Sequence, residues 1–261
     1  MEMHRYLLVA VLLCSSAIDA QARGRSGARV ETVTFRYLVP RGSDRPAVSS
    51  RHPRPPPLIP LPQTRQHSGS ACGIYCVQSL SAYAGKPTRR GSQLIRQAKG
   101  YSYEIGTPEQ TMGKLARKLG LKVQTRTRMK LSQLVSHVSN GRPVVVGLQA
   151  WVDNPKQVNW RKEQDSGHYA VVIGIGDRKG NLIESSREIG KKIRKQDAFV
   201  WFMDPSMDLG KRGYIPLKEF VSRWHWPSES GKSPSSRFGM ALMSHPRPAQ
   251  ISAVTGVGRI E

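Results

Sequence analysis

A cysteine, a histidine and an aspartate in this chain have the types and settings that nucleophilic catalysis needs. Cys72 follows the polar loop Arg65–Ser70 and precedes the apolar segment Ile74–Leu80, which predicts a thiol in the first turn of a helix. The unpaired N–H groups and the positive dipole end at that place favour a thiolate, the form that attacks a carbonyl. Gln66, six residues upstream, could fold back beside the Cys72 N–H and complete a two-donor oxyanion hole.

A thiol nucleophile also needs a base and a group that orients the base. His168 opens the apolar run Gly167–Gly174, which is typical of a buried strand. Asp204 follows the apolar run Phe199–Met203 and precedes a proline, so it is expected where a second strand ends in a turn. Asp165 is an alternative orienting acid. The chain order Cys, His, Asp, with the cysteine on a helix and the other two on strands, is that of papain-like peptidases.

Each of these residues alone also has an ordinary structural explanation. A lone cysteine is more often a buried small apolar residue, and an aspartate before proline is more often a turn residue. Cysteine and histidine residues do not show the paired spacing of a zinc site, so neither a metal nor a cofactor is expected. The catalytic interpretation therefore rests on the joint pattern.

That joint pattern resembles the bacteriocin-processing cysteine peptidases, which cleave double-glycine leaders. The similarity covers roughly residues 62 to 226. It consists of Gln66 with five residues before Cys72, the pair Cys72-Gly73, Gly167-His168-Tyr169 ahead of Val-Val-Ile-Gly, and Met203-Asp204-Pro205-Ser206. The resemblance implies Gln66 as oxyanion donor, Cys72 as nucleophile, His168 as general base and Asp204 as its orienting partner. It also implies an α+β papain-like fold, with an N-terminal helical half packed on an antiparallel β-sheet half.

The elements that must position these residues can be read from apolar spacing and turn residues. Helices are predicted over 72–84, 92–98, 107–119, 131–140 and 216–226, the third opening with the capping box Thr107-Pro108-Glu109-Gln110. Strands are predicted over 143–148, 167–174, 199–203 and 238–243. The loop 151–165 carries Trp151 and Trp160, which either grip a substrate or pack the loop down. Cys76 is expected in the core.

The two ends of the chain are expected to lie outside the domain. Residues 1–22 have a basic start, a short apolar run and an A-x-A-like site, which indicates a cleaved signal peptide and a secreted or periplasmic protein. A lipoprotein is disfavoured because Leu13, not a small residue, precedes Cys14. Residues 23–62 are rich in Arg and Pro and are expected to be mostly disordered, with an edge strand at 30–39. The peptidase domain is predicted over 63–244 and a flexible tail over 245–261.

Composition adds a prediction about partners. The chain has 261 residues, with 41 Lys+Arg against 18 Asp+Glu and a formal net charge of +23. Such an excess either reflects a general bias of composition that serves solubility or attracts anions, in which case an anionic envelope polymer held by the basic arm 23–62 is a candidate partner. Nucleic acid is not expected, because no cationic cluster is interleaved with aromatic residues. No membrane span is expected after signal cleavage, and the mature chain is predicted to be a monomer.

Two functions from different classes remain at this stage. The first is a secreted, stand-alone cysteine peptidase that hydrolyses peptide bonds in a peptide or protein substrate. The second is a catalytically inactive papain-like module that binds peptides or cell-envelope material. The reactivity of Cys72 separates them, because only the first needs a thiolate.

Overall fold

The computed structural model describes residues 52–87, 89–227, 234–235, 237–243 and 256–260. The predicted signal peptide, the predicted edge strand at 30–39 and most of the basic arm lie outside these ranges. Five α-helices and nine strands form within them: α1 (Cys72–Tyr83), α2 (Gly91–Gln97), α3 (Glu109–Lys118), β1 (Val123–Arg126), α4 (Leu131–Ser139), β2 (Val144–Gln149), β3 (Gly167–Asp177), β4 (Ala198–Met203), β5 (Lys211–Pro216), α5 (Leu217–Arg223), β6 (Trp226–Pro227), β7 (Pro234–Ser235), β8 (Gly239–Leu242) and β9 (Gly256–Arg259). A short 3₁₀ helix, η1 (Lys195–Asp197), precedes β4. None of the described helices combines the length and apolar character needed to cross a bilayer.

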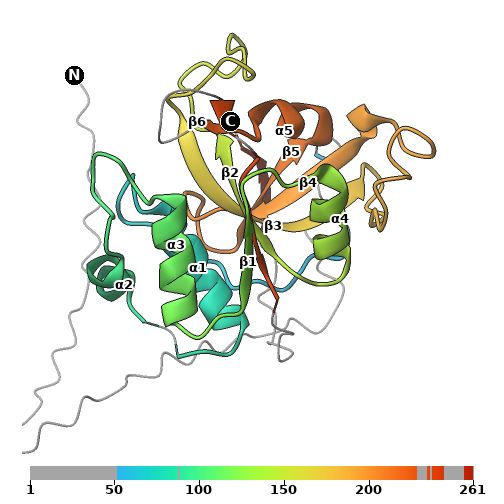
Figure 1. The fold of residues 1–261 in the computed structure, drawn as a ribbon. Coiled ribbons are helices and arrows are strands. Elements are labelled where there is room, and N and C mark those ends of the chain that lie inside the picture. Colours follow the sequence, from blue (N-terminus) through green and yellow to red (C-terminus); the bar gives the residue numbers. More distant parts are fainter. Residues whose placement is uncertain (1–51, 88, 228–233, 236, 244–255, 261) are drawn as a thin grey trace, which may run out of the picture. The chain divides into compact units, whose positions relative to one another are not determined.

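Seven of the strands form one sheet in the order β1-β8-β2-β3-β4-β5-β9. Neighbouring strands run antiparallel, except that β9 lies parallel to β5. Figure 1 shows α1, α2 and α3 on one side of the sheet and α4 and α5 on the other. The α+β, papain-like prediction is confirmed, with the early helices packed on a mostly antiparallel sheet.

The core lies between α1 and the central strands. Strands β2 and β4 are buried along their whole length, as their runs of β-branched and aromatic residues predict. Helix α1 is buried on nearly all sides and not only along the stripe Ile74, Val77 and Leu80. A helix that is buried all round must be held at a fixed distance from the sheet, so the position of its first residue is well determined.

Residues 53–62 pack against the sheet, although the sequence predicted the domain to start at residue 63. Backbone hydrogen bonds join Ile59 N to Ile173 O at 2.8 Å and Arg54 N to Arg178 O at 3.2 Å. A Cβ at Gly174 would lie only 2.5 Å from Leu58 Cδ2, so a larger residue there would displace the Leu58 side chain where this segment crosses β3. The folded domain therefore includes the prolines at the end of the predicted arm, and Pro53 and Pro56 are buried.

The predicted flexible tail is wrong at its end. Gly256–Arg259 forms β9 on the edge of the sheet beside β5, and the following Ile260 is fully buried. Its side chain fills the space above Gly213. No apolar alternation in the sequence marks this segment as a strand, because glycines occupy every other position. Residues 244–255 lie outside the described ranges.

Local details of three other predictions also differ. The capping box does not form: Pro108 is the N-cap of α3 without a side-chain cap, and Thr107 Oγ1 is buried with no hydrogen bond to a described residue. Strands β1 and β5 were not predicted, because both are short and carry several charged or polar residues. Helix α5 ends at Arg223, three residues earlier than expected.

Candidate active site

Cys72 is the first residue of α1. The N-cap residue Ala71 makes no side-chain cap hydrogen bond, and no acidic residue occupies the first turn. Helix-start N–H groups are therefore left for another acceptor, and no carboxylate in the first turn opposes a thiolate. Gly73 is explained by close packing, because a Cβ there would lie 3.0 Å from Thr107 Cβ and 3.1 Å from Tyr169 Cδ2. The Cys-Gly pair thus lets the start of α1 approach β3.

His168 and Asp204 are brought together by the register of β3 and β4. The two strands are antiparallel, and Met203 at the end of β4 pairs with Val171 near the start of β3. The residue after β4 therefore lies beside the first residues of β3. His168 Nε2 is 2.8 Å from Asp204 Oδ1, and both side chains are buried. Asp204 Oδ1 also accepts a 2.8 Å hydrogen bond from Ser206 N, which fixes the carboxylate at the turn.

The other side of the His168 ring interacts with Cys72. Burial alone lowers the pKa of His168, but the Asp204 carboxylate and a hydrogen bond with the Cys72 side chain outweigh burial and raise the pKa to about 10. Because Nε2 is bonded to Asp204, Nδ1 is the nitrogen left for the thiol. The structure thus brings together Cys72, His168 and Asp204, the three residues that the sequence singled out from positions far apart in the chain. Such an arrangement favours a thiolate–imidazolium pair.

Gln66 is held near the same site by its backbone. Gln66 N donates a 2.8 Å hydrogen bond to Pro205 O, so the loop before α1 is tied to the turn that carries Asp204. Its side-chain Nε2 donates to Gly69 O at 3.4 Å, while Oε1 is buried without a hydrogen bond to a described residue. A half turn about the last side-chain bond would exchange the positions of Nε2 and Oε1. The Gln66 amide, which was predicted as an oxyanion donor, therefore lies in the loop before α1, but its Nε2 is hydrogen-bonded to Gly69 of the same loop.

A second glutamine, Gln63, which the sequence analysis did not single out, forms a hydrogen bond with the turn that contains Asp204. Gln63 Nε2 donates a 2.6 Å hydrogen bond to Asp204 O, and Gln63 Oε1 accepts one from Arg212 Nη1. Arg212 is buried in β5. Nothing in the sequence indicates this pair of residues, because Gln63 and Arg212 become neighbours only when β5 pairs with β4.

The two tryptophans of the loop 151–165 have different surroundings. Trp160 packs against Arg223, whose guanidinium lies 3.5 Å from the ring centroid, and its carbonyl oxygen accepts a 2.7 Å hydrogen bond from His225 Nε2. Trp151 is 42% exposed, and its ring centroid lies edge-on, 6.4 Å from that of His168. Trp151 is also the non-glycine residue with a positive φ, 64°, among the described residues. Trp160 therefore packs the loop down, whereas Trp151 stands exposed beside the histidine.

The remaining candidates lie away from this cluster or have a structural role. Asp165, the alternative orienting acid, is exposed, and its N–H bonds Glu163. Cys76 is buried and free, its Sγ lies 3.4 Å from Tyr169 O, and burial raises the pKa of its thiol well above 9.0. No group of three or more His, Cys, Asp or Glu side chains in the described part of the chain could hold a metal ion. Cys72 is thus the described thiol that faces a base.

An α+β fold with a helix-borne cysteine facing a strand-borne histidine defines the class of papain-like cysteine peptidases. Within that class the chain belongs to the Peptidase_C39 like family, whose model matches residues 58–230. The resemblance to bacteriocin-processing peptidases is confirmed at the level of this family. The family's activity is cysteine peptidase activity, and its substrates are peptides.

Several solved structures are similar to this chain. A protein from Bacillus anthracis described as a C39-like peptidase shares 16% identity, with a TM-score of 0.44, over 77% of this chain and 98% of its own. The peptidase domain of Streptococcus ComA, a bifunctional ABC transporter, shares 13% identity at a TM-score of 0.42, over 70% of this chain and 99% of its own. A double glycine motif protease from an AMS/PCAT transporter, solved with its leader peptide, shares 16% identity at 0.41, over 75% and 98%. No curated protein matches the chain.

Proposed function

We propose that this protein is a cysteine peptidase that hydrolyses peptide bonds through Cys72, His168 and Asp204. The observation that carries the proposal is the position of His168, whose Nε2 is bonded to the buried Asp204 carboxylate and which also interacts with the Cys72 side chain. A base held between a thiol and a buried carboxylate is the arrangement that activates a sulfur nucleophile.

The chemical steps follow from this geometry. Cys72 Sγ attacks the peptide carbonyl carbon and forms a tetrahedral intermediate, whose oxyanion accepts hydrogen bonds from the free N–H at the start of α1. Gln66 supplies a second donor once its amide leaves Gly69. His168 then passes its proton to the departing amine, and the C–N bond breaks to leave a thioester on Cys72. His168 next takes a proton from water, which attacks the thioester and releases the acid product and the thiol.

The place of action and the substrate belong to the same proposal. Residues 1–22 have the pattern of a cleaved signal peptide, so the mature enzyme acts outside the cytoplasm. The family membership favours a peptide substrate. Mass spectrometry of exported protein tests the location, with a mature N-terminus at Arg23 expected.

Thiol labelling and peptide profiling test the chemistry. An iodoacetamide-based probe should label the purified protein at Cys72, and a peptide library that includes Gly-Gly-X sequences should yield discrete cleavage sites. Cys72→Ala should abolish both. Cys76→Ala is the matched control, because it removes the buried thiol one turn along the same helix and should leave both intact. Folded protein with an inert Cys72 and an uncut library would instead identify a peptide-binding module without catalysis.

A further inference from the structure

A groove lies between α4 and α5. Figure 1 shows these two helices on the side of the sheet opposite α1. Its volume is about 940 Å³, within the range of ligand sites. Its walls come from the start of α4, from α5, from η1 and the loop before it, and from the segment before β8. The groove is therefore separate from the Cys72 site, because Cys72 begins α1 on the other side of the sheet.

The floor of the groove is apolar. Met129, Leu217 and Trp224 are each about 1% exposed and close it from below. Leu131 and Val221 stand on the two helical walls and are partly exposed. An apolar floor of this kind can bind the apolar side chains along one face of a peptide helix.

The rim of the groove is entirely cationic. Six exposed basic side chains surround the floor, and no aspartate or glutamate is among the described lining residues: Arg128, Lys130, Arg161, Lys195, Lys218 and Arg237. None of the six forms an ion pair with a described residue. They come from five separate segments of the chain, so their charge encircles the apolar floor. Such a ring attracts a ligand that carries negative charge along more than one side.

His225 adds a polar site to the same groove. Its Nε2 bonds Trp160 O and must therefore carry the hydrogen, while Nδ1 is buried with no hydrogen bond to a described residue. A buried nitrogen of this kind needs a donor to complete its hydrogen bonding. A peptide offers N–H and side-chain donors, whereas an acyl chain offers none.

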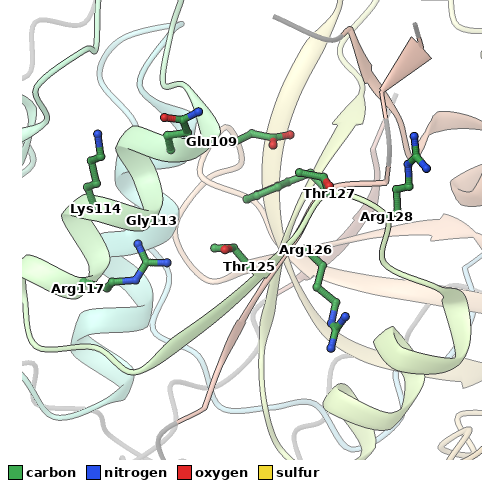
Figure 2. A pocket seen from close by; sticks show the side chains of 10 residues that line it. Glu109, Gly113, Lys114, Arg117, Thr125, Arg126, Thr127 and Arg128 are labelled. Atoms are coloured by element: carbon green, nitrogen blue, oxygen red, sulfur yellow. The ribbon is translucent and has the colours of Figure 1, made fainter.

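A second groove, between α3 and β1, also has basic walls but lacks these features. Figure 2 shows Arg117 directed toward Thr125, while Lys114 and Arg126 extend in other directions. Glu109 lies in the same groove and adds a negative charge. Its cations therefore do not converge on an apolar floor, and it serves as the control surface below.

We propose that the groove between α4 and α5 binds an acidic, amphipathic peptide segment of a partner protein. An anionic lipid concentrates its charge at one end, which does not match cations on all sides of an apolar floor. A peptide helix with an apolar stripe between two rows of Asp or Glu does match. The inference does not depend on the proposed peptidase activity, since the groove contains none of the residues of that site.

Fluorescence anisotropy with a designed probe tests the proposal in the full chain carrying Cys72→Ala, which prevents cleavage. The probe is a labelled 20-residue peptide with leucine at i, i+3, i+4 and i+7 positions and glutamate on both flanks. We expect the double variant Lys130→Gln/Lys218→Gln to weaken binding by about fivefold or more, since two partly solvated charge pairs are lost. Val221→Asp should weaken it by about tenfold, because it sets a carboxylate in the apolar wall.

The matched control is Lys114→Gln/Arg117→Gln, which removes the same charge from the α3–β1 groove and should leave the affinity unchanged. A scrambled peptide of the same composition should bind at least about fivefold more weakly, because its apolar stripe is lost. Equal losses in both double variants, or equal binding of the scrambled peptide, would show a general charge effect and overturn the proposal. Binding of phosphatidylglycerol vesicles through Lys130 and Lys218, without binding of the peptide, would assign the groove to a membrane surface instead.

Discussion

The proton on His168 should make the stability of this protein depend on pH. Its pKa is about 10 in the folded chain against an ordinary 6.5, because the effects of Asp204 and Cys72 exceed that of burial. In Cys72→Ala, where no thiolate offsets the imidazolium, the folded chain therefore keeps a proton that the unfolded chain has already lost. Stabilisation by this group is complete below about pH 6.5 and is lost progressively as the pH rises toward about 10.

The size of the effect follows from one retained proton. Each pH unit well inside that range lowers the free energy of unfolding by about 1.4 kcal/mol, so a rise from about pH 6.5, where the unfolded histidine is still half protonated, to about pH 8.5 should cost roughly 2 kcal/mol. This window isolates His168. Burial lowers the pKa of His137, so its contribution changes only below about pH 6.5, whereas the raised pKa of Cys76 matters only as the pH nears 9.0.

Asp204→Asn removes the charge and keeps a side-chain oxygen that can face His168 Nε2. Without the carboxylate, burial should dominate and bring the histidine pKa down, so the stability slope should nearly vanish. Urea unfolding of the reduced protein at three pH values in the window gives the slope directly. All chains carry Cys72→Ala, and the control His137→Gln should keep the slope of the Cys72→Ala chain. A flat profile of the Cys72→Ala chain, or an unchanged slope after Asp204→Asn, would refute the assignment of a retained proton to His168.

Three further perturbations test the supporting structure. Gln63→Ala should lower the free energy of unfolding by about 1–3 kcal/mol and reduce kcat more than it changes KM, because it removes the hydrogen bonds that Gln63 makes with Arg212 and with the Asp204 carbonyl; urea unfolding and steady-state kinetics measure both. Gly73→Ala should destabilise the protein by about 1–3 kcal/mol in thermal melts, because its Cβ would overlap two neighbouring side chains, whereas no loss would mean that α1 can move away from β3. Trp151→Ala should change stability by less than about 0.5 kcal/mol but raise KM roughly tenfold, and an unchanged KM would assign this exposed ring no part in substrate binding.

The residues of the candidate site could be predicted because each lies at the end of a strongly patterned element. Cys72 stands where a polar loop meets a helix, His168 where an apolar strand begins, and Asp204 where another ends. These are local signals, and the adjacency of two antiparallel strands then converts them into a spatial cluster. The helices α1, α2 and α4 and the strands β2, β3 and β4 were predictable for the same reason, since each has a clear apolar period and a turn residue at its end.

What the sequence did not reveal depends on contacts made after folding. Strand β1 lies at an edge of the sheet, where partial exposure permits polar residues and removes the apolar alternation, whereas β5 carries the buried Arg212, whose partners come together only on folding. Residues 53–62 have the composition of a disordered arm, yet glycines in β3 leave room for them to pack. The sequence could not distinguish the roles of Trp151 and Trp160, because both are tryptophans of one loop. Their neighbours in the folded chain show that Trp151 is exposed and that Trp160 packs against Arg223.

The packing of residues 53–62 has a direct consequence for the site. The chain runs from this segment through Gln63, which holds the Asp204 turn, and through Gln66, which bonds Pro205, before it reaches Cys72. The loop that leads to Cys72 is therefore joined to the Asp204 turn by two hydrogen bonds, one from the Gln63 side chain and one from the Gln66 backbone. Any shift of the segment against β3 must move the turn or break these bonds. For this reason the prolines and Gln63 act on the geometry of the site although none of them contacts the thiol, and a truncation meant to probe the basic arm has to stop before residue 52.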